Sequence, residues 1–236
     1  RNVSYTEIPE MNMQWFADEI RKSDRVKLNI KDLTDIEIIE HYNLIDKGKL
    51  TNLGVLWLGT ASQRSRLVYP LTVQYIVYDD LEKKIRKEDW QDYSKNPKEL
   101  LLEIEKEAIE LTYYDEFPLG LFRNKIRHYD ARLIRELLIN AIAHKSYTIS
   151  GDIFIKVYQD RLEITNPGGL PLGITKDNIL HTTYRRNPHL IRILHDLKLM
   201  EGEGTGYNLI YEITSRDAKA FPIPISDYNA TSITQY

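Results

Sequence analysis

Apolar residues recur at the helical period along much of the chain. Segments with this pattern cover residues 11–23, 35–41, 97–114, 131–147, 188–198 and the stretch that follows residue 206. Thr34 and Asp130 are suited to cap two of these helices, and Pro97 is suited to the first turn of a third. The pattern therefore predicts several amphipathic helices.

Other segments alternate between apolar and polar residues, as half-buried strands do. Residues 71–80 are rich in β-branched and aromatic residues, and residues 152–158 and 161–165 read as a hairpin joined at Gln159-Asp160. The second hairpin strand leads into the turn cluster "NPGGLPLG". The tail from residue 220 offers at most one strand.

The first half of the chain is harder to interpret from its pattern. Lys47-Gly48 predicts a tight turn, and "KLTNLGVLWLG" after it fits either a strand or a buried helix. We expect a division near residue 125. Residues 1–125 would form a linker and a small α/β segment, with a winged-helix-like element as one option, and residues 126–236 would form a second domain. The predicted fold class is α+β.

Composition limits the class of protein more than its function. The chain has 236 residues, 42% hydrophobic and 28% charged, with a formal net charge of −3. These values are typical of a globular protein and give no global attraction to nucleic acid. The sequence has no cysteine and no apolar run long enough for a membrane span, so we expect a reducing, cytoplasmic setting and no membrane partner. Because it begins without Met, we expect a fragment of a longer protein.

The helix predicted at residues 131–147 carries a polar stripe beside its apolar face. Glu136, Asn140 and His144 are spaced by four residues, so their side chains share one side of the helix. A Glu one turn before an Asn could activate a water molecule while the Asn oxygen holds Mg²⁺. The stripe also fits a solvated helix flank, and His144 also fits a partner for the helix dipole.

Two further features could bind phosphate. Gly202, Gly204 and Gly206 precede a predicted helix, where backbone N–H groups can close on an anion, although such glycines also serve as flexible connectors. No Gly-Lys-Ser/Thr follows them, so they do not form a Walker A loop. Arg185 and Arg186 could contact a phosphate in a bidentate manner or simply face solvent.

The order of these features resembles a known ATPase module. The run "RELLINAIAHKSY…RLEITNPGGLP…RRNPHLIRILHDL…GEGTGYNLIYE" is similar to the module shared by gyrase, Hsp90, histidine kinases and MutL. More closely, it resembles the variant at the C-terminus of RecG-related helicases and transcriptional regulators of bacteria. In those proteins a Schlafen-type AlbA domain usually precedes it. The segment "NLIDKGKLTNLGVLWLG" resembles the linker that follows that domain.

The resemblance assigns roles to residues by position. It implies a two-layer α/β sandwich of the histidine-kinase and Hsp90 ATPase type, with Glu136 as general base and Asn140 as Mg²⁺ ligand. Gly168 and Gly169 fall at the adenine-contacting turn, and Gly202, Gly204 and Gly206 fall at the phosphate loop. Asn166 takes the place of the Asp that normally accepts a hydrogen bond from the adenine amino group. An Asn can accept through its amide oxygen but carries no charge.

The resemblance implies the following function. The chain would be the C-terminal fragment of a DNA-binding transcriptional regulator that carries an ATPase-like domain for ATP and Mg²⁺. Nucleic acid would bind through the preceding domain. We also expect the protein to form a homodimer. The alternative is a scaffold or dimerisation module that has lost nucleotide binding. The sequence contains no helicase motor motifs.

Overall fold

The computed structural model describes residues 3–119, 122–175, 178, 184–200, 205–217, 219–222, 224–227 and 229–236, with only the backbone considered for residues 115–119, 122–127 and 205–207. A six-stranded mixed sheet organises this fold, with the strand order β4-β3-β7-β8-β10-β9. Its strands are β3 (Val73–Tyr78), β4 (Lys84–Trp90), β7 (Ile153–Val157), β8 (Leu162–Pro167), β9 (Pro224–Ser226) and β10 (Ala230–Gln235). β3 and β7 pair in parallel, and the other neighbours pair antiparallel.

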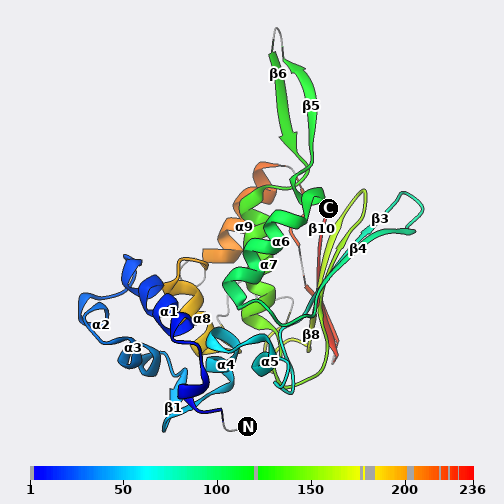
Figure 1. Cartoon of the computed structure of the whole chain (residues 1–236). Helices are drawn as coiled ribbons and strands as arrows, with labels where there is room; N and C mark the ends of the chain where they lie inside the picture. The colour runs from blue at the N-terminus through cyan, green and yellow to red at the C-terminus, as the bar shows by residue number, and fades with distance from the viewer. Residues whose placement is uncertain are drawn as a thin grey trace.

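Three helices lie together against this sheet, as Figure 1 shows: α6 (Pro97–Glu107), α7 (Ala131–His144) and α9 (Thr205–Arg216). α7 is central, because it contacts β8, α6, α8 and α9. The sheet meets these helices through its alternate apolar positions, and Tyr75, Ile155 and Ile164 are among the buried ones. The result is a two-layer α+β sandwich.

The N-terminal part is helical and packs beside the sandwich. It contains α1 (Glu10–Lys22), α2 (Leu28–Lys31), α3 (Asp35–His41), α4 (Asn52–Leu58) and α5 (Ala61–Arg64), with short strands β1 (Ile45–Asp46) and β2 (Lys49–Leu50) between α3 and α4. Its buried side chains, such as Phe16 and Trp57, belong to the same hydrophobic core as those of α7.

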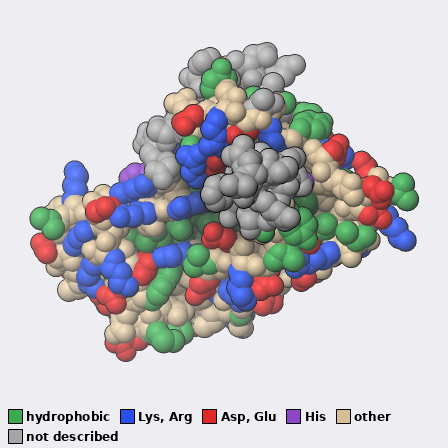
Figure 2. Space-filling model, turned by 90° about the horizontal axis from the view of Figure 1, so that it is seen from above, with side chains coloured by type: hydrophobic (Ala, Val, Ile, Leu, Met, Phe, Trp, Pro, Cys, Tyr) green, Lys and Arg blue, Asp and Glu red, His purple; other side chains and the backbone are tan. Residues whose placement is uncertain are grey.

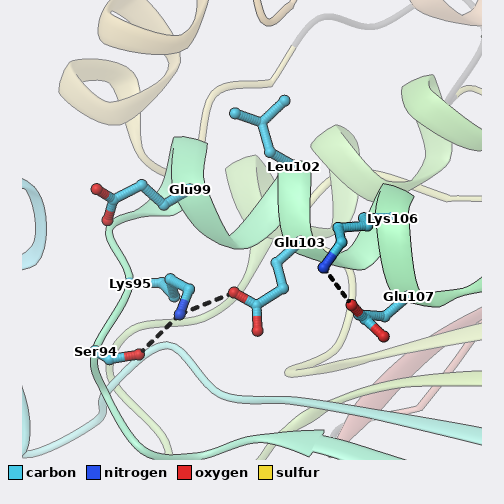
Figure 3. A pocket seen from close by; sticks show the side chains of 7 residues that line it. All are labelled: Ser94, Lys95, Glu99, Leu102, Glu103, Lys106 and Glu107. Atoms are coloured by element: carbon cyan, nitrogen blue, oxygen red, sulfur yellow. Dashed lines mark hydrogen bonds and ion pairs between the residues drawn. The ribbon is translucent and has the colours of Figure 1, made fainter.

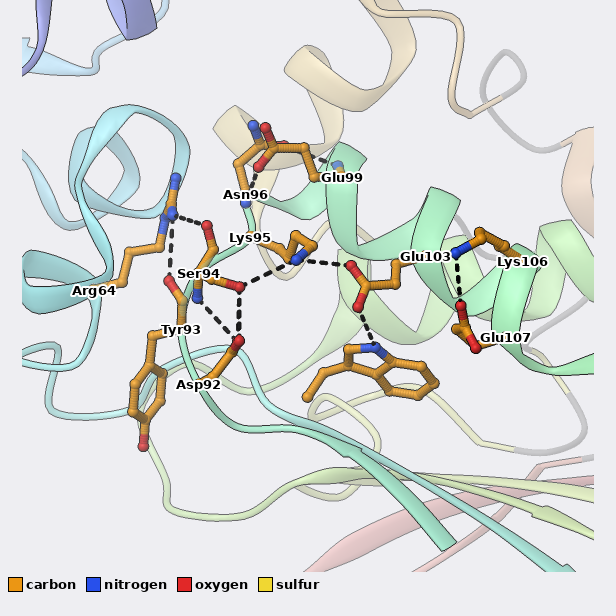
Figure 4. A network of polar contacts seen from close by, with 11 residues as sticks. Arg64, Asp92, Tyr93, Ser94, Lys95, Asn96, Glu99, Glu103, Lys106 and Glu107 are labelled. Carbon is orange, nitrogen blue, oxygen red and sulfur yellow. Dashed lines mark hydrogen bonds and ion pairs between the residues drawn. The ribbon is translucent and has the colours of Figure 1, made fainter. Parts of the chain in front are cut away.

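Hydrogen bonds from Arg64 connect this helical part to the segment that precedes α6. Its buried guanidinium donates to the carbonyl oxygens of Tyr93 and of Ser94, the latter at 3.0 Å (Figure 4). It also donates to the carbonyl oxygens of Trp57 and of Leu56, the latter at 3.0 Å. Burial lowers the pKa of Arg64, and the guanidinium satisfies backbone acceptors from two elements that are distant in sequence.

A hairpin of β5 (Tyr114–Leu119) and β6 (Phe122–Arg127) stands away from the body in Figure 1. Its two strands pair with each other and form a separate two-stranded sheet. Helices α8 (Pro188–Asp196) and α9 complete the described elements, together with short 3₁₀ turns at Tyr5–Glu7 and Ile109–Thr112. None of the described helices is long and apolar enough to cross a membrane.

Most of the predicted elements are confirmed. Thr34 caps α3 through a reciprocal pair of hydrogen bonds with Glu37, and Asp130 caps α7. The segment after Gly48 is the buried helix α4, not a strand. Two predictions were wrong: the helix that begins at Pro97 ends at Glu107 instead of Tyr114, and the tail forms two strands instead of at most one.

The six-stranded sheet takes strands from both sides of residue 125. β3 and β4 belong to the predicted segment 1–125, and the remaining strands belong to 126–236. The division near residue 125 and the winged-helix-like character of the first part stay predictions.

Candidate functional site

The polar stripe of α7 lies beside the buried apolar face of that helix. Leu133, Leu137 and Leu138 are buried, as the apolar pattern predicts. Glu136 is also buried, with 4% of its surface exposed, while Asn140 and His144 are half-buried. The stripe is therefore not a solvated flank.

Glu136 and Asn140 are joined by a hydrogen bond. The Nδ2 of Asn140 donates to the Oε1 of Glu136 at 3.0 Å, one helical turn away. This bond orients the amide so that its Oδ1 is directed away from Glu136. Among the described residues no donor to the Oδ1 of Asn140 is present, and an amide oxygen is a ligand that Mg²⁺ accepts.

Asn166 brings the end of β8 against the same helix. Its Nδ2 donates to the carbonyl oxygen of Ala141 at 2.7 Å, so the side chain lies beside the residue that follows Asn140. The Oδ1 of Asn166 is buried and has no hydrogen-bond partner among the described groups. A buried acceptor without a donor costs about 1–3 kcal/mol, so this oxygen is suited to a donor that arrives with a ligand.

The turn after β8 depends on glycine at one position. Gly168 has φ +93°, and a Cβ atom there would lie 2.7 Å from the Cβ of Ser146 and 3.1 Å from a guanidinium nitrogen of Arg186. The backbone of Gly168 is held by Asn229 and Thr231 through its N–H and carbonyl groups. Gly169 accepts a hydrogen bond from Arg186 at its carbonyl oxygen.

Side chains satisfy the carbonyl groups that the end of α7 leaves open. The last carbonyl groups of a helix have no intrahelical donor and need other partners. Ala141 is bound by Asn166, Ile142 by Tyr147, Ala143 by Asn187, His144 by Arg186 and Lys145 by Asn187. The segments "NPGG" and "RRNP" are thus both joined to the helix that carries the stripe.

Arg186 donates hydrogen bonds to backbone carbonyl groups. Its guanidinium donates to the carbonyl oxygen of His144 at 3.2 Å and to that of Gly169. Burial lowers the pKa of this group. Arg185 is exposed. The two neighbouring arginines are therefore placed differently, and Arg186 connects α7 to the glycine turn.

Two basic side chains at the end of α7 lie in low-dielectric surroundings. Burial lowers the pKa of His144 to about 4, and the nearby charge of Arg186 adds to the effect. Burial also lowers the pKa of Lys145 to about 8, although Asp152 acts in the opposite direction. Lys145 is 0% exposed, and its Nζ has no hydrogen-bond partner in the described part of the chain.

The glycine-rich segment is described only in part. Gly202 and Gly204 lie outside the described residues. Gly206 lies in the first turn of α9, which begins at Thr205, so it belongs to the helix and not to the loop that precedes it.

A hollow in the surface lies over α6 (Figure 3). Its polar side chains pair with one another: Lys95 with Glu103 at 2.8 Å, and Lys106 with Glu107 at 2.9 Å. Figure 4 shows that the Lys95–Glu103 pair continues into the contacts around Ser94 and Asp92. The charged side chains of this hollow are therefore already paired with one another.

Charge on the wider surface is mixed. On the face seen from above in Figure 2, Lys and Arg side chains are interspersed with Asp and Glu. In the described ranges no group of three or more His, Asp or Glu side chains could hold a metal ion. A Mg²⁺ ion at Asn140 would thus need most of its ligands from phosphate and water, as is common for this ion.

Several residues of this region were not found from the sequence. Asn187 precedes Pro188 and looks like an ordinary helix N-cap, but it makes no cap to α8 and donates to α7 instead, at 2.8 and 2.9 Å. The burial of Lys145 has no signal in the local pattern. Asn140, in contrast, is hydrogen-bonded to Glu136 as their four-residue spacing allows, and Asn166 donates to Ala141 on the same helix.

Comparison with known proteins finds a family model that matches part of the chain and a solved structure with a similar fold. Residues 151–234 match the family model described as "Putative ATP-dependent DNA helicase recG C-terminal". No match was found among curated proteins. The crystal structure of the DIP2311 protein from Corynebacterium diphtheriae has a similar fold, with a TM-score of 0.76 and 18% identity over 99% of this chain and 46% of that chain. The present chain thus spans less than half of that protein, and the similarity shows the fold alone.

Proposed function

We propose that the chain binds ATP with Mg²⁺ between α7 and the end of β8. The premise is that residues 151–234 form a RecG-related ATPase-like C-terminal domain. α7 precedes the matched residues, and its contacts place it beside them. The hydrogen bond from Asn166 to Ala141 joins the matched segment to α7.

The single observation that carries the proposal is the buried Oδ1 of Asn166, which has no donor among the described groups. The Nδ2 of the same side chain is held by Ala141, so the amide cannot rotate to offer a donor without losing that bond. An exocyclic amino group of adenine would supply the missing donor. Guanine and hypoxanthine carry an oxygen at that ring position and would leave two acceptors facing each other.

Asn140 and Glu136 fit the phosphate end of such a ligand. The Oδ1 of Asn140 is held by its amide bond to Glu136 and would act as a Mg²⁺ ligand. Glu136 is buried beside it and would accept a proton from an attacking water molecule. Bound Mg²⁺ would neutralise developing charge on the phosphate oxygens. Hydrolysis of ATP is thus the reaction that this arrangement supports.

Arg186 and the glycine turn would shape the site without contacting phosphate. Arg186 ties the carbonyl groups of His144 and Gly169 together, which sets the distance between α7 and the turn after β8. We assign it the role of a positioning residue. Arg185, Gly202, Gly204 and Gly206 remain candidates for the phosphate end of the site.

At the level of the whole protein, we propose a cytoplasmic DNA-binding regulator of bacterial type. The description of the matching family supports a link to nucleic acid in general. Acidic and basic side chains are interspersed on the face that Figure 2 shows. Within this proposal the main nucleic-acid contact lies in a preceding domain of the Schlafen AlbA type, where basic side chains would bind phosphates. A homodimer is part of the same proposal.

A thermal unfolding experiment tests nucleotide binding. Mg²⁺ with a non-hydrolysable ATP analogue at 100 times its Kd should stabilise the chain by about 2.7 kcal/mol. Asn140→Ala should abolish the Mg²⁺-dependent part of this shift. Asn29→Ala, on the exposed side of α2, is the matched control and should keep the full shift. No shift at millimolar nucleotide would refute the proposal.

One observation favours a second candidate function, a scaffold that has lost the nucleotide. Asn166 is neutral where the ATPase module of gyrase and Hsp90 normally carries an Asp, and both its amide nitrogen and Arg186 are already used within the fold. A scaffold would keep the sandwich and its capped helix without a ligand. It would show no response to Mg-ATP while the chain still self-associates, which sedimentation velocity would detect.

A further inference from the structure

The segment between α8 and the glycine-rich run begins with a tight turn. The amide groups of Leu199 and Met200 both donate to the carbonyl oxygen of Leu194, at 2.8 and 3.1 Å. Lys198 has φ 58°, the left-handed conformation that commonly ends a helix. These two bonds and the left-handed residue fix the turn Lys198–Met200 that follows α8.

Arg25 holds this turn from the N-terminal helical part. It lies in the connection between α1 and α2 and is half-buried. Its Nη1 donates to the carbonyl oxygen of His195 at 3.2 Å and to that of Met200. One guanidinium nitrogen thus binds both the last turn of α8 and the turn that follows it. Hydrogen bonds from a charged donor are about twice as strong as neutral ones.

Arg135 holds the same turn from α7. Its guanidinium donates to the carbonyl oxygen of Lys198 at 2.7 Å. Arg135 immediately precedes Glu136 in the helix, so the turn is connected directly to the backbone that carries the proposed site. The turn Lys198–Met200 is therefore held between the N-terminal helices and α7.

We propose that Arg25 is a positioning residue for the nucleotide site, and that it transmits the position of the N-terminal helices to that site through the turn at Lys198–Met200. This inference rests on the proposed function and adds a regulatory input to it. A shift of α1 and α2 that moves Arg25 would release Met200 and loosen the turn whose Lys198 carbonyl oxygen accepts from Arg135, the neighbour of Glu136. Nucleotide affinity is then coupled to whatever holds the N-terminal helices in place.

Other contacts of the same interface provide a control. Tyr42, at the end of α3, donates its hydroxyl to Asp196 at 2.6 Å. This bond also ties the N-terminal part to α8, but it acts on the side chain of Asp196 and not on the turn. Tyr42→Phe therefore weakens the packing between the two parts without releasing Met200.

The test compares Arg25→Gln, Arg25→Lys and Tyr42→Phe with the wild type in the full chain. Isothermal titration with Mg²⁺ and a non-hydrolysable ATP analogue should show about 10-fold weaker binding for Arg25→Gln, within the range typical of coupled sites. Arg25→Lys should recover part of the loss, and Tyr42→Phe should bind as the wild type does. Without nucleotide, amide exchange at Leu199 and Met200 should become faster in Arg25→Gln but not in Tyr42→Phe.

The outcomes separate this inference from the proposed function. If the wild type binds no Mg-ATP, the proposed function is wrong and the inference falls with it. If the wild type binds and Arg25→Gln binds equally well, only the inference is overturned. Equal loss of affinity in Arg25→Gln and Tyr42→Phe would also overturn it, because the effect would then come from general packing of the N-terminal helices.

Discussion

Lys145 places an ammonium group in the interior of the protein directly after α7. The ring centre of Tyr147 lies 5.3 Å from its Nζ, and nearby Asp152 already accepts hydrogen bonds from Thr72, Gln74 and Gln91. A buried charge without a hydrogen bond costs stability, and here it lowers the pKa from 10.5 to about 8. Folding therefore disfavours the protonated form.

This arrangement predicts that Lys145→Met stabilises the protein at neutral pH. Below pH 8 the lysine is charged in both the folded and unfolded states, so the variant should gain about 1–3 kcal/mol in the free energy of unfolding. Between pH 8 and 10.5 the wild type releases its proton on folding, its stability rises relative to the variant, and the gain should fade. Urea unfolding at pH 7 and pH 10 measures both values. A destabilised variant at pH 7 would show that the amine has a stabilising role.

We predict a steric effect of an added side chain at Gly168, and a comparison with Gly173 separates it from the effect of backbone conformation. Gly168 and Gly173 have similar positive φ values, +93° and +87°, but a Cβ at Gly173 meets nothing within 4 Å. Both Gly→Ala variants bear the cost of an alanine in this conformation, about 1 kcal/mol. Gly168→Ala should lose a further 1–3 kcal/mol or so, because its Cβ collides with Ser146. Equal losses in the free energy of unfolding, measured with denaturant, would mean that the turn at Gly168 shifts to accommodate the added Cβ without cost.

At the level of elements, the end of α7 is stabilised by side chains from other segments. Asn187 alone binds the carbonyl groups of Ala143 and Lys145. Asn187→Ala should therefore destabilise the protein by about 1–3 kcal/mol, as expected when hydrogen-bonded acceptors lose their donor. Asn52→Ala, at an exposed position of α4, should change stability by less than about 0.5 kcal/mol. Thermal unfolding of the two variants checks this difference, and equal stabilities would show that water replaces Asn187.

Local chemistry is what allowed the helices to be predicted. The capping residues Thr34 and Asp130, the proline at position 97 and the helical spacing of apolar residues all act within a few positions of the helix that they predict. The early end of α6 has a long-range cause. Arg86 on β4 donates to the carbonyl oxygen of Glu107 at 3.0 Å and pairs with Glu110, which holds the chain out of the helix. A single-sequence pattern carries no information about such a partner.

The same distinction applies to the candidate site. Glu136 and Asn140 lie on one helix, so their juxtaposition follows from spacing alone. Asn166 was found because its turn resembles a known motif. The contacts of Arg186, Asn187 and Arg25 with backbone carbonyl groups could not be predicted, since a carbonyl acceptor is present at every residue and does not distinguish one position from another.

At the scale of the whole molecule, the sheet connects the two halves of the chain. β3 pairs in parallel with β7 from Val73↔Ile153 to Val77↔Val157, and this pairing requires the long crossover through α6 and α7. The fragment 126–236 would lose this partner strand and expose one edge of β7. Unpaired backbone groups and apolar side chains at that edge favour aggregation over folding.

We therefore expect that fragment 126–236 shows no cooperative thermal transition, whereas fragment 68–236, which keeps β3 and β4, does. Circular dichroism melting curves of the two fragments test this. A cooperative transition of 126–236 with the melting temperature of the full chain would establish the division near residue 125 as a true domain boundary.

The central claim is that the stripe of α7 and the end of β8 form one nucleotide site. A crystal structure of the chain with Mg²⁺ and a non-hydrolysable ATP analogue tests it most directly. We predict Mg²⁺ at about 2.1 Å from the Oδ1 of Asn140, and the adenine amino group within about 3 Å of the Oδ1 of Asn166. Nucleotide bound elsewhere, for example over α6, or no bound nucleotide at millimolar concentration, would contradict the account.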